Sequence, residues 1–134
     1  MWNVKKVVIS AGCIAVLAIG MWAGKYLITV QKYKDTIKKL EIGTVDLSKV
    51  SDGKYTGGCD ALLISAKVEV TISNKKIKNI VLLNHKNERG KPAEVITDRV
   101  VEAQSLQVDA ISGATNSSKV ILKAIENALK AGQA

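Results

Sequence analysis

Aromatic and metal-binding residue types are scarce in this sequence. It has no Phe, and aromatic residues make up 4% of its 134 residues, too few for the stacking platform of a single-stranded nucleic-acid binder. One His and two cysteines, Cys13 and Cys59, exclude a disulfide scaffold and His-rich or Cys-rich metal sites. We therefore expect no nucleic-acid partner and no metal site, and a function that rests on other side chains or on a cofactor.

Charge is absent from one long stretch near the N-terminus. No charged residue occurs from Val7 to Gly24, and the apolar character continues to Val30. A membrane-spanning helix needs about 20 such residues, and two lysines precede the run, as in a signal anchor. The run is longer than the roughly 7–15-residue apolar core of a cleaved signal peptide. We predict an uncleaved anchor over residues 1–30, with a cleaved signal peptide and a buried soluble helix as alternatives.

Lysines dominate the segment that follows, residues 31–45. Tyr33, Ile37 and Leu40 lie at helical spacing within it, so we predict a helical stalk that ends near Gly43. A basic stalk at this place is expected to be a solvated spacer that also attracts anionic lipid headgroups, rather than a nucleic-acid binder. Lysines lie on both sides of the apolar run, and the positive-inside rule alone would keep the C-terminal part in the cytoplasm.

Apolar and polar residues alternate in the remaining segment, 46–134, which we expect to fold as one domain. Residues 52–58 suggest a turn, a short strand and a Gly-rich break. Residues 66–73 alternate strictly, as in a half-buried strand. A turn at Asn74-Lys75 would lead into a second strand over 76–84, which is apolar on both faces and is therefore predicted to be central.

Two helices are predicted after a polar loop that begins at His85. Pro92 suits the first turn of one helix. The second helix is expected to start at Ser117 or Ser118 and to end before Gly132. The expected fold class is α+β, a small antiparallel sheet packed with two helices and preceded by a transmembrane helix.

Small and hydroxyl-bearing residues crowd the segment before the last helix, Asp109-Ala110-Ile111-Ser112-Gly113-Ala114-Thr115-Asn116-Ser117-Ser118. A helix N-terminus offers unpaired N–H groups and the positive end of a dipole, which suit a phosphate. A Ser that caps the helix, after a Gly that turns the chain, would explain the same residues. The G-x-x-x-x-G-K and G-x-S-x-G patterns are absent. Spacing alone leaves an anion site and an ordinary N-cap open.

This string resembles the flavinylation motif of the FMN-binding domain family: Asp, two variable residues, Ser/Thr-Gly-Ala-Thr, any residue, Ser/Thr. The family occurs in subunits of sodium-translocating quinone reductases and related membrane complexes, and in small membrane-anchored electron-transfer proteins. The resemblance extends over residues 46–131. It implies FMN in phosphoester linkage to Ser117, where the family's commonest residue is Thr, with Ser118 as the alternative acceptor. A separate flavin transferase would take this FMN from FAD and release AMP.

The resemblance also implies roles for the neighbours of the acceptor. Ser112, Gly113, Ala114 and Thr115 would form the loop that the transferase recognises and that holds the phosphate. Asp109 would fix this loop or help the transferase to align the acceptor. No residue of the chain is expected to act as a catalytic nucleophile in its own turnover.

A second loop resembles the segment near the isoalloxazine ring in the respiratory-complex relatives. His85, Glu88 and Gly90 match its His, acid and Gly. His85 would hydrogen-bond the flavin or carry a redox-linked proton, and a solvated surface His is the alternative interpretation of the same residue.

The function implied by the resemblance is that of a redox carrier rather than a stand-alone enzyme. FMN would relay electrons from a membrane donor to an acceptor outside the membrane, as in extracellular electron transfer. The family's transferase commonly acts outside the cytoplasm, so we expect a single-pass protein of the cell membrane with its C-terminal domain on the extracytoplasmic side. Two alternatives are a reductase that binds FMN non-covalently and a flavin-free anchored adaptor.

Overall fold

A computed structural model describes residues 3–86 and 91–133 of the chain, which divides into two compact units, Met1–Lys32 and Tyr33–Ala134. Helix α1 (Val4–Lys39) forms the first unit from Val4 onward and continues into the second unit. Among the described residues, α1 is the one helix that is long and apolar enough to cross a membrane, with a mean hydropathy of 2.1 over its most apolar window. By length and composition it fits the predicted span.

The end of α1 belongs to the second unit and comes earlier than predicted. The helix stops at Lys39 rather than near Gly43. The Leu40 N–H is shared between the carbonyls of Thr36 and Ile37, at 3.1 and 3.2 Å, a tightening that often closes a helix. Ile37 is 6% exposed and joins the hydrophobic core of the second unit. The basic stalk is therefore not solvated along its whole length.

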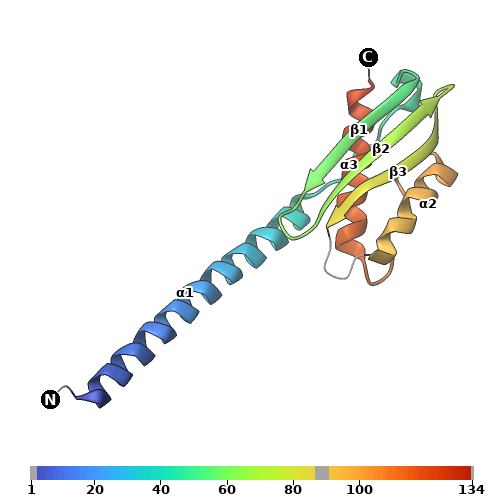
Figure 1. Cartoon of the computed structure of the whole chain (residues 1–134). Coiled ribbons are helices and arrows are strands. Elements are labelled where there is room, and N and C mark those ends of the chain that lie inside the picture. The colour runs from blue at the N-terminus through green and yellow to red at the C-terminus, as the bar shows by residue number, and fades with distance from the viewer. Residues whose placement is uncertain (1–2, 87–90, 134) are drawn as a thin grey trace. The chain divides into compact units, whose positions relative to one another are not determined.

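An antiparallel sheet forms one layer of the second unit (Figure 1). Its strands are β1 (Gly53–Asp60), β2 (Ser65–Ser73) and β3 (Lys76–Lys86), in the spatial order β1-β2-β3. The two residues between β2 and β3, Asn74 and Lys75, both have positive φ, 53° and 62°, as a tight hairpin turn requires. The alternating strand and its turn are confirmed.

Two strand predictions were wrong. Gly57 and Gly58 do not break β1 but pair with β2 inside the ladder. The strand β3 is an edge strand, because its only neighbour among the described strands is β2. Val81 and Leu83, which suggested burial on both faces, are 42% and 49% exposed.

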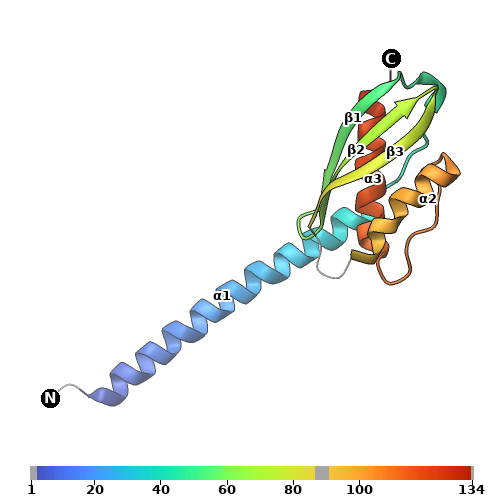
Figure 2. The same ribbon diagram turned by 45° about the vertical axis from the view of Figure 1, so that its right-hand side comes forward.

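Helices cover one face of the sheet (Figures 1 and 2). Helix α3 (Thr115–Ala131) packs against β1 and β2. The short 3₁₀ helix η2 (Lys91–Val95) continues into α2 (Ile96–Ala103), which packs against β3. A further 3₁₀ turn, η1 (Leu47–Lys49), precedes β1. The α+β fold class is confirmed, while Pro92 lies in η2 instead of the first turn of an α-helix.

Gly57 lets β1 and α3 come into direct backbone contact. A Cβ atom at this position would lie 2.3 Å from both the Ala124 carbonyl oxygen and the Ala128 nitrogen. No side chain fits in that distance, so only a glycine allows this approach. The glycine that resembled a break is thus a packing residue between the two layers.

A buried carboxylate holds the far half of α3. Glu126 is 2% exposed, and its carboxylate lies 2.9 Å from the ammonium groups of Lys123 and Lys130. Burial alone would raise the pKa of Glu126. The hydrogen bonds from Lys130, Lys123 and the Gly43 N–H outweigh burial and hold this pKa below its ordinary value. The carboxylate therefore fastens the segment after α1 to α3.

Candidate functional site

The motif segment turns directly into α3. Ala114 donates its N–H to the Ile111 carbonyl at 2.9 Å, and Gly113 has a φ of +79°, as at the third position of a type II turn. This turn starts the helix at Thr115, two residues before the earlier of the two predicted starts. The N-cap is Ala114, which forms no side-chain capping bond. The interpretation of Ser117 or Ser118 as the N-cap is therefore wrong.

Ser118 ties the turn to the first helical turn. Its side chain is completely buried, and its hydroxyl donates to the Ala114 carbonyl at 2.8 Å. The same hydroxyl oxygen accepts the Ile111 N–H at 2.9 Å. Both bonds are internal to the fold, so this hydroxyl already has partners and is covered.

Ser117 has the same burial without any such bond. It is 1% exposed, and its Oγ has no hydrogen-bond partner among the described residues. Ser117, Ile121, Ala124 and Ala128 follow helical spacing and are all buried, so the hydroxyl lies on the buried side of α3. A buried hydroxyl without a partner costs about 1–3 kcal/mol. Such an atom in a native fold calls for a functional explanation.

The surface of the motif is formed by its other members. Ser112, Gly113 and Thr115 are exposed, whereas Ala114 is 6% exposed. A Cβ built on Gly113 would meet nothing within 4 Å, so the tip of the turn stands in open space. Asp109 is exposed in the segment before the turn. The structure thus brings an accessible tip and a covered hydroxyl within one helical turn of each other.

His85 lies in β3 and not in a solvated loop. Its side chain is 2% exposed, and Nδ1 is 3.2 Å from a carboxylate oxygen of Glu94 in η2. The interpretation of His85 as a solvated surface residue is therefore wrong. The sequence analysis did not predict Glu94 as a partner of His85. Glu94 lies in a 3₁₀ turn, and such a short turn has no repeating pattern of apolar residues that would reveal it. The predicted partners Glu88 and Gly90 lie outside the described residues.

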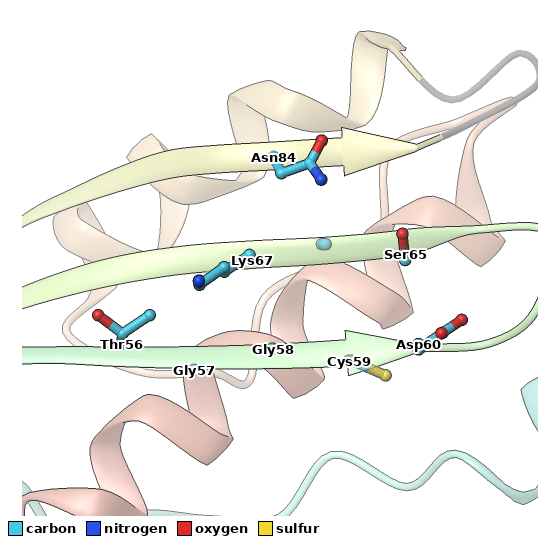
Figure 3. Close-up of a pocket in the computed structure, with 9 residues that line it drawn as sticks. Thr56, Gly57, Gly58, Cys59, Asp60, Ser65, Lys67 and Asn84 are labelled. Carbon is cyan, nitrogen blue, oxygen red and sulfur yellow. The ribbon is translucent and has the colours of Figure 1, made fainter.

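An open hollow lies on the sheet face that turns away from α3 (Figure 3). Thr56 and Gly58 of β1, Lys67 of β2 and Asn84 of β3 are among its lining residues. None of the motif residues lines this hollow. Cys59 borders it, and burial raises the pKa of its thiol, which keeps the thiol protonated at neutral pH. The hollow is thus separate from the motif and carries no reactive thiolate.

Comparison with known proteins identifies the region that contains the motif. Residues 65–130 match the FMN-binding domain family. Over 84 residues, 60% of this chain, the sequence is 37% identical to the NADH:acrylate oxidoreductase of Vibrio harveyi, and the match covers 8% of that protein. Over 89 residues, 64% of the chain, it is 28% identical to an uncharacterized protein of Treponema pallidum (strain Nichols), with 25% of that protein covered. The chain spans a quarter or less of these relatives' lengths.

The residues at the start of α3 fit the phosphate end of FMN. A phosphoester needs a hydroxyl, and the Ser117 Oγ is uncommitted among the described residues. A phosphate also needs donors, and the first N–H groups of a helix supply them together with the positive end of its dipole. The N-cap residue, Ala114, has no side-chain oxygen that could compete for those groups. The open space around Gly113 leaves room at the tip of the turn.

Proposed function

We propose that the chain, whose residues 65–130 match the FMN-binding domain family, is a membrane-anchored flavoprotein electron carrier with FMN in phosphoester linkage to Ser117. The observation that carries this proposal is the buried Ser117 hydroxyl, which has no partner among the described residues. Ser118, the alternative acceptor, already holds two hydrogen bonds through its hydroxyl. The contrast favours Ser117 as the acceptor.

The linkage would form by transfer from FAD. The Ser117 Oγ would attack the phosphorus atom that bears the riboflavin part, and the pyrophosphate bond to AMP would break. AMP would be the leaving group, the hydroxyl proton would pass to solvent, and no atom would change oxidation state. The flavin transferase that catalyses this step would contact the exposed residues Ser112, Gly113 and Thr115. Asp109 is exposed as well, which supports a role in aligning the transferase.

The chain's own residues would then hold and tune the flavin. The N–H groups at the start of α3 would bind the phosphoester oxygens. Bound FMN exchanges one or two electrons, which lets it pass them between unlike partners. His85 would hydrogen-bond the flavin or carry a redox-linked proton, as the resemblance implies, and Glu94 would hold its ring in place through Nδ1.

The anchor and the redox role rest on separate observations. Helix α1 supports insertion into a membrane by its length and hydropathy, and the lysines at its C-terminal end, Lys38 and Lys39, suit anionic headgroups. The matched region is a small part of a much longer oxidoreductase in Vibrio harveyi, which supports a module that carries electrons. We propose a membrane donor, and an acceptor on the extracytoplasmic side.

Intact-mass analysis tests the proposal directly. The full chain is coexpressed with a flavin transferase as the wild type, as Ser117→Ala and as Ser118→Ala. We expect the wild type and Ser118→Ala to gain one FMN less one water, and Ser117→Ala to gain nothing. Wild-type samples made without the transferase serve as the control.

Other outcomes would count against the proposal. A Ser117→Ala chain that still gains FMN moves the acceptor to another hydroxyl. A yellow chain whose flavin is released by acid denaturation favours non-covalent binding and a reductase. A colourless wild type after coexpression favours the flavin-free adaptor.

A further inference from the structure

The acceptor hydroxyl is covered in the folded chain, although a transferase must reach it. Ser117 is 1% exposed and lies on the buried side of α3. Residues on the same stripe, Ile121 and Ala124, are completely buried. The Ser117 hydroxyl can therefore reach solvent only when the first turn of α3 separates from the rest of the domain.

Two features make this first turn easy to open. Its N-cap, Ala114, has no side-chain oxygen to bond the free N–H groups of the helix, so the stabilisation that a Ser, Thr or Asp cap provides is missing. The covered Ser117 hydroxyl has no partner among the described residues, so opening gains hydrogen bonds to water.

One side chain holds the turn closed against these two features. The Ser118 hydroxyl joins the Ile111 N–H, before the turn, to the Ala114 carbonyl, after the turn. The Ser118 N–H also donates to the same Ala114 carbonyl, at 2.9 Å. We call this set of bonds the Ser118 clasp. Ser118 lies one residue beyond the Asp109–Ser117 pattern, and its side chain is not among those that the transferase is expected to recognise. The clasp ties this side chain to the backbone of the turn, at Ile111 and Ala114.

We propose that Ser118 is a positioning residue that controls access to the acceptor: FMN attaches only when the Ser118 clasp opens. The inference rests on the proposed function, since it takes Ser117 as the acceptor. The clasp sets the population of the open form, and the transferase acts on that form. Loss of the Ser118 hydroxyl removes two buried hydrogen bonds from the closed form only. The population of the open form therefore rises.

A thiol at the acceptor position measures opening without any flavin. The host is the full chain in detergent micelles with Cys13→Ala, Cys59→Ala and Ser117→Cys, and the probe is a small aromatic disulfide reagent. Ser118→Ala is added to break the clasp. The matched control is Ile125→Val, a buried substitution on the same helix that trims the core without touching the clasp.

We expect Ser118→Ala to raise the labelling rate of the introduced thiol at least about fivefold, as the loss of a net hydrogen bond implies. Ile125→Val should change it by less than about twofold. Equal labelling rates in all three chains would overturn the proposal, because access would then not depend on the clasp. Equal acceleration by both substitutions would also overturn it, because access would then follow global stability.

A second measurement keeps the native serine, since cysteine is larger than serine. The wild type, Ser118→Ala and Ile125→Val are flavinylated under limiting transferase, and the initial rate is followed by intact mass. Ser118→Ala should react faster than the other two and reach the same final extent. A slower Ser118→Ala chain would overturn the proposal. If no chain gains FMN, the proposed function fails, while the labelling rates still decide whether the clasp controls access.

Discussion

The two ends of α3 are built in opposite ways. Near its C-terminal end, the buried Glu126 carboxylate has three donors, and Gly57 brings the β1 backbone against the helix. At its N-terminal end, Ala114 provides no cap and the Ser117 hydroxyl is covered with no partner among the described residues. One helix therefore contains a fully satisfied half and an unsatisfied first turn.

This difference separates stability from function. The satisfied half does what a core requires: it pairs its buried carboxylate and packs the β1 backbone directly against the helix. The first turn contains a buried hydroxyl whose free-energy cost packing does not explain. The same turn contains part of the motif. Unsatisfied groups of this kind persist where a ligand or a modification completes them. We therefore assign the fold to one end of α3 and the chemistry to the other.

Gly57→Ala should break the satisfied half most severely. The added methyl group would lie 2.3 Å from the Ala124 carbonyl oxygen, so β1 and α3 must move apart. We expect a loss of about 3 kcal/mol or more in the free energy of unfolding, measured by urea denaturation. Gly58→Ala is the matched control, because its nearest neighbour, the Ala66 carbonyl oxygen, lies 3.4 Å away. Equal losses in both variants would contradict the close approach.

Glu126→Gln should weaken the same half by about 2 kcal/mol at neutral pH, because a buried, hydrogen-bonded charge is lost. The pKa of Glu126 is lowered from its ordinary 4.5. The stabilisation is therefore fully present above pH 4.5 and is lost as pH falls through the lower, folded-state pKa. The difference between the wild type and the variant should shrink in acid.

Urea denaturation between about pH 3 and pH 7 checks this dependence. Glu102→Gln, an exposed carboxylate on α2, is the control and should change little. A difference between wild type and Glu126→Gln that stays constant across this range would refute the role of the charge.

Ser117→Ala should have the smallest effect, and in the opposite direction. The variant removes a covered hydroxyl without a described partner, so the unmodified chain should be equally stable or more stable by about 1 kcal/mol. The same variant should lose all FMN attachment. Ser118→Ala provides the contrast, because it breaks two hydrogen bonds and should lower stability. A Ser117→Ala chain that is less stable than Ser118→Ala would contradict the unsatisfied state of the first turn.

The sequence predicted the parts of this fold that depend on local pattern. Strict alternation identified β2, and Asn74 with Lys75 identified the turn after it. Gly57 was wrongly predicted to break the strand, because the sequence does not reveal which helix will pack against this position. The edge position of β3 was missed for a similar reason: apolar residues on both faces do not reveal whether a second layer exists to cover them.

The candidate site was predicted in chemistry but not in geometry. The motif pointed to Ser117 and Ser118 as hydroxyls before or at the start of a helix. Only the structure separates them, because their different hydrogen bonds depend on the turn at Gly113 and on the earlier helix start. His85 was expected in a loop, and its pairing with Glu94 depends on a 3₁₀ turn that has no sequence period.

Fragmentation of one tryptic peptide would decide which hydroxyl carries the flavin. Cleavage after Arg99 and Lys119 releases residues 100–119, which hold Ser112, Thr115, Ser117 and Ser118 together. We predict that tandem mass spectrometry of the flavinylated full chain will locate FMN on Ser117 alone. FMN on Ser118, or on either exposed hydroxyl of the turn, would contradict the assignment of the covered, unpartnered hydroxyl as the acceptor.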